Sequence, residues 1–239
     1  MKNLVRVTAV SPEVHIGNVV ENIKEIASEC SRVTTDIIVT PELSLVGYTT
    51  QDLLFNRSIL KEFKDNFTRN MSFLMKAIGS STILVVGAPV EYNNTLYNCA
   101  IVLSNNAVLG VVPKCYLPNY NEFYEKRWFN SGFDDLPETI NLGGKDIPFG
   151  HSLVFNTGNY KFGVEICEDL WAPNPPSVNM CLNGAEIIVN LSASNETIGK
   201  SNYRRALVAQ QSARWSSEST SDIVFSGHNI IAENGSIIA

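Results

Sequence analysis

The sequence contains few cysteines, and they are not spaced for disulfides or for zinc. Five cysteines are scattered over 239 residues without a C-x-x-C pair, which excludes a disulfide framework or a zinc ribbon as the basis of the fold. The three histidines, His15, His151 and His228, are isolated from one another in the sequence. We therefore expect reduced thiols and no bound metal. A Cys-His hydrolase requires folding to bring a histidine to a cysteine.

Long apolar runs and clusters of basic residues are also missing. Nowhere do about 18 apolar residues follow one another, as a membrane span requires, and the first ten residues lack the apolar core of a signal peptide. The formal net charge is -6 and the basic residues are dispersed, which argues against nucleic acid as a partner. These absences predict a cytoplasmic protein that binds neither membrane nor nucleic acid and acts on a small polar substrate.

A phosphate-binding loop is the last missing feature. The run SASNETIGKS ends in GKS, but Ser194 stands where a P-loop needs its first glycine. Because this glycine lets the backbone approach the phosphates, we expect no nucleotide site in the chain.

What the sequence does contain is a regular alternation of strands and helices. Apolar runs predict strands at 4–10, 36–43, 82–90 and 185–193, and helical spacing of apolar residues predicts helices at 22–33, 58–78, 178–183 and 200–214. Two hairpins are expected, one at 96–114 with Asn105 and Asn106 in a positive-φ turn, the other at 152–167 turned at 157–159. A last pair of strands is expected in 222–227 and 228–239. This order predicts one α/β domain with a mixed sheet.

The segment from Cys115 to Gly150 interrupts this regularity. It is rich in aromatic residues, prolines, glycines and charges. Because it is too long for an ordinary connection, we predict that it forms a binding loop.

Three polar residues stand at the ends of predicted buried strands: Glu42, Lys114 and Cys167. Each has an ordinary explanation taken alone, since free cysteine often fills a core and a charged residue at a strand end usually meets solvent. Together they provide a thiol nucleophile, a carboxylate that can take its proton, and a cation that can hold the charge developing on a carbonyl oxygen. Strand ends on one edge of an α/β sheet can converge on one substrate, so a catalytic site is predicted there.

The motifs around these residues resemble a known family. PELSLVGY, PKCYLPNYNEFYEKRWF and EICEDLW occur in this order and are similar to the Glu, Lys and Cys motifs of the nitrilase (carbon-nitrogen hydrolase) superfamily. PELSLVGY running into TTQDLL, and CEDLWAPNPPS followed by AEIIVNLSASNETIGK, resemble more narrowly the glutaminase domains of glutamine-dependent NAD synthetases. The resemblance runs almost from end to end and implies an αββα sandwich with mixed sheets.

The resemblance also implies an activity and its residues. Cys167 would attack the carboxamide of L-glutamine, Glu42 would move the protons, and Lys114 would stabilise the oxyanion. A second carboxylate, Glu125, would hold Lys114 and the substrate amide. Further glutamine contacts are implied for Tyr48, Tyr120, Phe123 and Ser194.

Close to the nucleophile, the pattern assigns supporting roles. Strand alternation predicts that Glu165 lies on the same face as Cys167. Glu168 and Asp169 are expected to act as scaffold, and Trp171 is expected to fix the chain that leaves the nucleophile.

The chain departs from the family in two places. The resemblance predicts that residues 1–239 form a glutaminase domain truncated at its C-terminus. On the same resemblance, we expect the synthetase domain, with its ATP and magnesium, to lie outside these residues. The glutaminase part needs no cofactor, its partners would be that domain and further copies in a homo-oligomer, and its ammonia would serve NAD synthesis from the deamido precursor. The helix ending near Arg214 passes directly into ESTSDIVF, so we expect residues near Trp215 to be missing from this sequence.

Two other functions remain open at this stage. The chain could be a stand-alone amidase or carbamoylase of the same superfamily that acts on another amide. It could also be an assembly module without activity, because glutaminase domains often need their synthetase partner to order the site.

Overall fold

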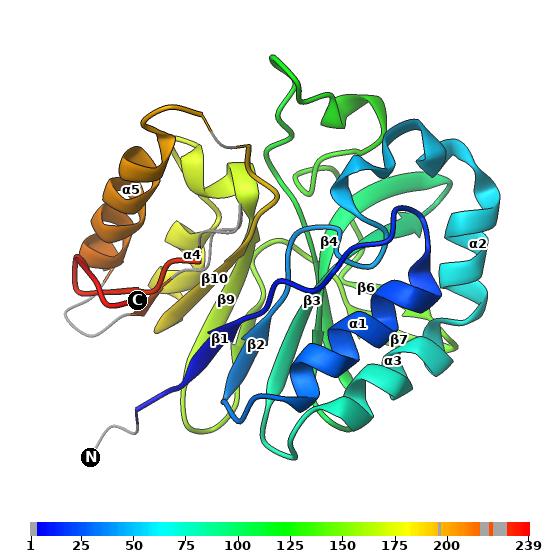
Figure 1. Cartoon of the computed structure of the whole chain (residues 1–239), viewed down its shortest axis with the longest axis horizontal. Coiled ribbons are helices and arrows are strands. Elements are labelled where there is room, and N and C mark those ends of the chain that lie inside the picture. Colours follow the sequence, from blue (N-terminus) through cyan, green and yellow to red (C-terminus); the bar gives the residue numbers. More distant parts are fainter. Residues whose placement is uncertain (1–3, 196, 216–219, 222–228) are drawn as a thin grey trace.

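Two sheets lie face to face between layers of helices (Figure 1). The computed structural model describes residues 4–195, 197–215, 220–221 and 229–239. Helices cover the outer side of each sheet, and the two sheets pack against each other through apolar side chains. This arrangement is the αββα sandwich that the resemblance implies, and the sheets are mixed as predicted.

The first sheet has the order β1-β2-β3-β4-β5. Strands β1, β2 and β3 are parallel, whereas β3, β4 and β5 are antiparallel neighbours. Parallel strands need a crossover, and helices supply it here. The bounds are β1 Val7–Ala9, β2 Ile37–Val39, β3 Ile83–Tyr92, β4 Thr95–Leu103 and β5 Val108–Pro113.

The second sheet has the order β13-β12-β11-β10-β9-β8. Strands β9, β10 and β11 are parallel, and antiparallel pairs flank them. The bounds are β8 Val154–Asn156, β9 Lys161–Ile166, β10 Ile187–Leu191, β11 Thr220–Ser221, β12 Ala232–Glu233 and β13 Ser236–Ile237.

Helices α1, α2 and α3 lie on the outer side of the first sheet, and α4 and α5 lie on the outer side of the second (Figure 1). The Asn18 side chain accepts a hydrogen bond from the Glu21 amide, which caps α1. The bounds are α1 Val19–Ser31, α2 Arg57–Asp65, α3 Phe67–Ala77, α4 Ser177–Leu182 and α5 Lys200–Trp215. Three short 3-10 helices complete the elements: η1 Tyr48–Phe55, η2 Glu125–Arg127 and η3 Cys167–Trp171.

Alternation along β4 separates the two core layers. Tyr97, Cys99 and Ile101 pack in the layer beneath the helices, whereas Ala100 and Val102 pack between the sheets. The layer between the sheets continues with side chains of β2, β5, β9 and β10. One end of this layer is where the site residues gather.

Two predictions about local structure were wrong. The helix expected at 58–78 is two helices, because Asn66 ends α2 and begins α3 with a non-helical backbone. The positive-φ asparagine turn belongs to Asn93 and Asn94, between β3 and β4, and not to the predicted pair. The predicted turn at Asn105 and Asn106 is held in part by the Ser104 side chain, which accepts a hydrogen bond from the Ala107 amide.

The segment 115–150 is more ordered than predicted. It contains η2 and a two-stranded sheet of β6 Thr139–Leu142 and β7 Lys145–Pro148. The strand predicted at 222–227 lies outside the described residues, and so do 216–219, on which the expectation of missing residues near Trp215 depends. None of the helices in the described residues has the length and apolar character needed to cross a bilayer.

Candidate active site

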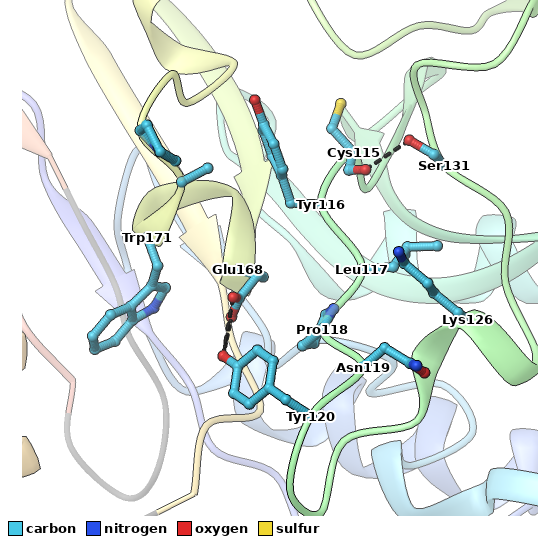
Figure 2. Close-up of a pocket in the computed structure, with 12 residues that line it drawn as sticks. Cys115, Tyr116, Leu117, Pro118, Asn119, Tyr120, Lys126, Ser131, Glu168 and Trp171 are labelled. Carbon is cyan, nitrogen blue, oxygen red and sulfur yellow. Dashed lines mark hydrogen bonds between the residues drawn. The ribbon is translucent and has the colours of Figure 1, made fainter.

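The predicted binding loop forms a cleft together with residues 167–173, the turn that begins at the candidate nucleophile Cys167 and is called the nucleophile turn below (Figure 2). Its volume is about 540 Å³, and it is lined by 115–120 from the loop and by Glu168 and 171–173 from the turn, with Lys126 and Ser131. The Tyr120 hydroxyl donates to the Glu168 carboxylate at 2.9 Å across the cleft (Figure 2). Cys167 is buried and is not among the lining residues, but it directly precedes Glu168, which is one of them.

Glu42 stands on a tight loop after β2. Leu43 adopts a positive φ of 52°, which is unusual for a leucine and turns the chain at once. Gly87 of β3 lies against this loop, and a Cβ at Gly87 would come within 2.4 Å of the Leu43 nitrogen. The close approach of the two backbones therefore requires glycine at this position.

The Gly87→Ala substitution is expected to displace the Glu42 loop, because backbone atoms at 2.4 and 2.5 Å cannot move aside cheaply. We expect a loss of about 2–4 kcal/mol in unfolding free energy, together with loss of any activity that depends on Glu42. Urea denaturation checks the first effect. Gly150→Ala is the control, since its nearest contact would lie at 4.0 Å; equal stability of the two variants would contradict the prediction.

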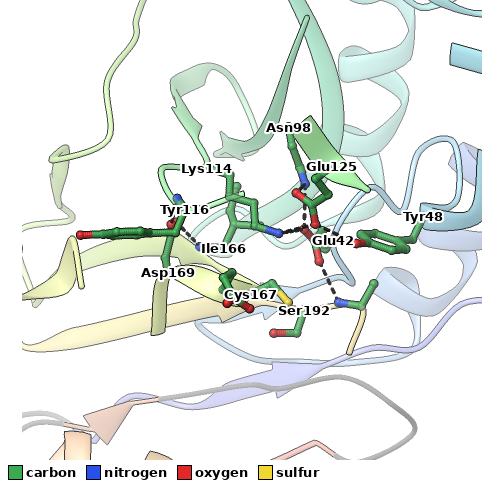
Figure 3. Close-up of polar contacts among 12 residues, drawn as sticks. Glu42, Tyr48, Asn98, Lys114, Tyr116, Glu125, Ile166, Cys167, Asp169 and Ser192 are labelled. Carbon is green, nitrogen blue, oxygen red and sulfur yellow. Dashed lines mark hydrogen bonds and ion pairs between the residues drawn. The ribbon is translucent and has the colours of Figure 1, made fainter. Parts of the chain in front are cut away.

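Lys114 follows β5 and is fully buried. Its ammonium lies 2.6 Å from Glu42 Oε1 and 2.6 Å from Glu125 Oε1 (Figure 3). Burial alone would lower the pKa of Lys114, but the Glu125 and Glu42 carboxylates outweigh it and hold the pKa well above its ordinary value. Lys114 therefore stays charged and joins the two carboxylates.

Glu125 sits at the start of η2 and has further partners. The Tyr48 hydroxyl donates to Glu125 Oε1 at 2.7 Å, and the Asn98 amide approaches Oε2 at 3.5 Å. Burial raises the pKa of Glu125 to about 7, Lys114 opposes this rise, and Glu42 adds to it. The cluster thus holds two carboxylates and one ammonium in a dry space.

Cys167 turns the chain where β9 ends. Its φ is 46°, a left-handed conformation that is rare for a residue with a side chain and costs about 1–3 kcal/mol. Burial first, and then the Glu42 charge, raise the pKa of the Cys167 thiol, although Lys114 and a hydrogen bond from Ser192 lower it in part. The thiol is therefore protonated at rest, so a base must take its proton during attack.

Asp169 ties the nucleophile turn to the lysine loop. Its Oδ1 accepts the amides of Cys115 at 3.0 Å and Tyr116 at 2.8 Å, and its Oδ2 accepts the amide of Ile166 at 3.0 Å (Figure 3). Burial raises the pKa of Asp169 to about 8. Segments that follow β5 and β9 in different sheets are thereby joined through one side chain, which agrees with the scaffold role expected for Asp169.

Glu165 does not share a face with Cys167, so that prediction was wrong. Phe162, Val164 and Ile166 pack with Cys167 between the sheets, whereas Glu165 accepts the Ser177 amide of α4 at 3.2 Å. The positive φ of Cys167 ends the alternation of the strand and sends its thiol to the inner face.

Glu165 nevertheless makes a testable contribution to stability. Burial raises its pKa to about 7, and its Oε1 has no hydrogen-bond partner among the described residues. A raised pKa means that the native state keeps the proton longer than the unfolded state, so stability falls as the pH rises from about 4.5 through about 7. Glu165→Gln should remove this slope and gain up to about 3 kcal/mol over wild type between pH 4.5 and 8. Urea denaturation across this pH range measures the unfolding free energy, and Glu13→Gln, at an exposed position, is the control. Parallel pH profiles of Glu165→Gln and wild type would refute the prediction.

Of the four residues expected to contact substrate, the three aromatic ones lie close to one another. Phe123 lies between Tyr48 and Tyr120, with ring centroids 6.3 and 5.8 Å apart, and Tyr48 reaches the charged cluster through Glu125. Ser194 is half-buried and its hydroxyl contacts the Asn195 carbonyl at 3.4 Å. Trp171 stacks on Tyr203 of α5 at 5.4 Å, which agrees with a structural role.

Three polar residues near the cluster or Cys167 were not predicted from the sequence: Asn98, Asn190 and Ser192. Asn190 donates to the Cys167 carbonyl at 3.4 Å and accepts the Ser192 hydroxyl at 2.7 Å. Each lies in or next to an otherwise apolar strand, in the runs LYNCAIV and IIVNLSA. A lone polar residue in a buried strand is a signal that could have identified them.

Other site chemistries find less support in the geometry. His151 places its Nδ1 2.9 Å from the Gly132 carbonyl and lies edge-on to Phe133. Within the described part of the chain, no group of three or more His, Cys, Asp or Glu side chains is placed to hold a metal ion. The groups that the buried site holds are the thiol of Cys167, the carboxylate of Glu42 and the ammonium of Lys114.

An αββα sandwich with a buried Glu-Lys-Cys site is the arrangement of a carbon-nitrogen hydrolase, and the carbon-nitrogen hydrolase family matches residues 6–216. The chain belongs to this family.

Its relatives narrow the similarity. The glutamine-dependent NAD(+) synthetase of Mycobacterium tuberculosis is 38% identical over 251 residues, which covers 98% of this chain and 36% of the relative. The solved glutamine-dependent NAD(+) synthetase of Cytophaga hutchinsonii has a TM-score of 0.81 at 23% identity and covers 98% of this chain and 40% of that one. A Nesterenkonia AN1 amidase of the nitrilase superfamily has a TM-score of 0.74 at 16% identity over 100% of this chain and 87% of the amidase. The chain thus spans about a third of the length of the synthetase relatives it matches.

Proposed function

We propose that this chain is the glutaminase part of a glutamine-dependent NAD synthetase and hydrolyses L-glutamine to glutamate and ammonia. The observation that carries the proposal is the buried ion cluster of Glu42, Lys114 and Glu125 beside a thiol held in a left-handed turn. The similarity to synthetase relatives supports glutamine as the amide.

The first half-reaction would form a thioester. The Cys167 sulfur attacks the carboxamide carbon while Glu42 takes the thiol proton, and the carbonyl oxygen gains a negative charge. Lys114 and the backbone N–H of Glu168 stabilise this oxyanion. When the tetrahedral intermediate collapses, the C–N bond breaks and Glu42 returns the proton to the departing ammonia.

The second half-reaction would release glutamate. Glu42 takes a proton from water, the water oxygen attacks the thioester carbon, and the C–S bond breaks with return of the proton to sulfur. Lys114 acts again on the oxyanion. Because the resting thiol is protonated, Glu42 must accept a proton in each half and be free of it before each attack.

Glutamine itself would be held by residues around the entrance of the site. Glu125 would orient the amide while it holds Lys114, and Tyr48, Tyr120, Phe123 and Ser194 would contact the rest of the molecule. The ammonia would serve a synthetase domain that requires ATP and magnesium, while the hydrolase part needs no cofactor. We place this activity in a cytoplasmic homo-oligomer.

The experiment combines turnover and labelling on the full chain. Ammonia release is measured with glutamine, asparagine, a nitrile and an N-carbamoyl amino acid, and intact mass is measured after treatment with a diazoketone analogue of glutamine. We expect turnover of glutamine alone, and one label per chain on Cys167 that excess glutamine blocks.

Two alternatives have distinct outcomes in this experiment. Faster turnover of another amide would favour a stand-alone amidase, for which the fold match to the Nesterenkonia amidase over most of its length is the supporting observation. No label and no turnover by a folded chain would favour an assembly module.

A further inference from the structure

Asn98 is a buried amide on an apolar strand face. It lies in β4 on the face shared with Ala100 and Val102, which pack between the sheets. Its side chain is 1% exposed. Burying an amide without partners costs about 1–3 kcal/mol in proteins, so its hydrogen bonds decide whether it is tolerated and what it does.

Asn98 contacts each charged residue of the cluster. Its Nδ2 donates to Glu42 Oε1 at 2.7 Å and approaches Glu125 Oε2 at 3.5 Å, and its backbone carbonyl accepts the Lys114 amide at 2.8 Å (Figure 3). The Asn98 Oδ1 has no partner within the described residues. The donor end of the amide, and not its acceptor end, is therefore what the cluster uses.

The hydrogen bonds on Glu42 distinguish its two oxygens. Oε1 accepts from both Lys114 at 2.6 Å and Asn98 at 2.7 Å, whereas Oε2 accepts from the Ala193 amide alone among the described residues, at 3.0 Å. A carboxylate oxygen has two lone pairs. Oε1 is saturated, and Oε2 keeps one lone pair for a proton.

We propose that Asn98 is a positioning residue: its Nδ2 group occupies Glu42 Oε1 and fixes the carboxylate so that Oε2 takes the proton of Cys167. The S–H bond of Cys167 breaks, an O–H bond forms at Oε2, and the electron pair stays on sulfur. This role rests on the proposed function. Without Asn98, a lone pair of Oε1 becomes free, the carboxylate can rotate, and the two carboxylates lose the neutral donor that lies near both.

The test measures alkylation of Cys167 by iodoacetamide, which needs no glutamine. Peptide mass spectrometry follows the rate at this cysteine from pH 6 to 9 in wild type, Asn98→Asp and Asn98→Ser, and ammonia release from glutamine is measured beside it. Asn70→Asp is the matched control, because Asn70 is also a buried asparagine but lies on α3. Circular dichroism confirms that each variant is folded.

We expect Asn98→Asp to slow alkylation at least tenfold at pH 9, the end of the range where the new carboxyl is most ionised and cannot donate. The difference in alkylation rate between Asn98→Asp and wild type should become smaller toward pH 6, because the introduced carboxyl, once protonated, can donate to Glu42 in place of the amide. Asn98→Ser, which is uncharged and too short to reach Glu42, should be slowed at least tenfold at every pH, with kcat reduced and KM within twofold. If Asn98→Asp does not fold, Asn98→Ser carries the test.

Three results would overturn the role of Asn98: alkylation of a folded variant within twofold of wild type, a deficit of Asn98→Asp that does not change with pH, or no alkylation of Cys167 in wild type. If wild type does not hydrolyse glutamine but its alkylation depends on Asn98 as expected, the proposed function fails and the positioning role stands.

Discussion

Cys167→Ala is expected to abolish glutamine hydrolysis and labelling by glutamine-like electrophiles, leaving the fold intact. The thiol forms the only covalent bond to substrate in the proposed mechanism. Any activity that Glu42 and Lys114 provide without it is therefore expected to be at least roughly 10³-fold below that of wild type. Cys167 is buried beside apolar residues, and alanine keeps most of that packing. The measurements are ammonia release and intact mass.

The chain offers a matched control for this loss. Cys181 is a free cysteine on α4 that is partly exposed, and Cys181→Ala should keep full turnover and full labelling. Cys167→Ser is informative as well, since a hydroxyl is a poorer nucleophile in the same position. Residual labelling of the Cys167→Ala chain with glutamine protection would show that another residue is the nucleophile.

Lys114→Met is expected to have the largest effect on stability. Lys114 is fully buried with a carboxylate oxygen at 2.6 Å on either side, and methionine removes the cation while keeping the length of the chain. Breaking a buried ion pair on one side typically costs about 3–5 kcal/mol, because the remaining charge is uncompensated. Here two carboxylates are left, so at pH 8 we expect at least this loss in unfolding free energy.

Activity should fall with stability in Lys114→Met. The variant lacks an oxyanion donor, whose loss alone costs about 10²–10³ in kcat. Lys114 lowers the pKa of Glu125, so without the cation this pKa should rise further, the native state should bind the proton of Glu125, and the destabilisation should be smaller at pH 5 than at pH 8. Urea denaturation at both pH values measures the loss of unfolding free energy, and Lys145→Met, at an exposed position, is the control. A loss independent of pH would mean that the carboxylates do not depend on Lys114.

The order of elements was largely predictable from the sequence, because burial periodicity is local. Strands β3, β4, β9 and β10 and helices α1, α4 and α5 lie where apolar runs and helical spacing predict them. The prediction failed where a single residue changes the backbone direction. Asn66 divides a continuous apolar stripe into α2 and α3, and periodicity alone does not register such a break because the stripe resumes in phase.

The candidate site was predictable in part for a similar reason. Glu42, Lys114 and Cys167 each follow an apolar strand, a signal that is local in the sequence, although these strands, β2, β5 and β9, belong to two different sheets. The contact between Lys114 and Glu125 was implied by the resemblance, and it is present at 2.6 Å. Asn98 was missed because its role depends on its Nδ2 lying 2.7 Å from Glu42 Oε1, a residue far away in the sequence that only the folded first sheet brings to it.

By itself, the sequence determined which residues could do chemistry: a thiol, a carboxylate and a lysine at the ends of buried strands, without the spacing of a metal or nucleotide site. Only the tertiary structure decided their directions and their charges. The left-handed turn at Cys167 sends the thiol to the inner face and leaves Glu165 on the other. The packing of the two sheets then removes water from the cluster, and this burial is what holds the thiol proton in place until a base takes it.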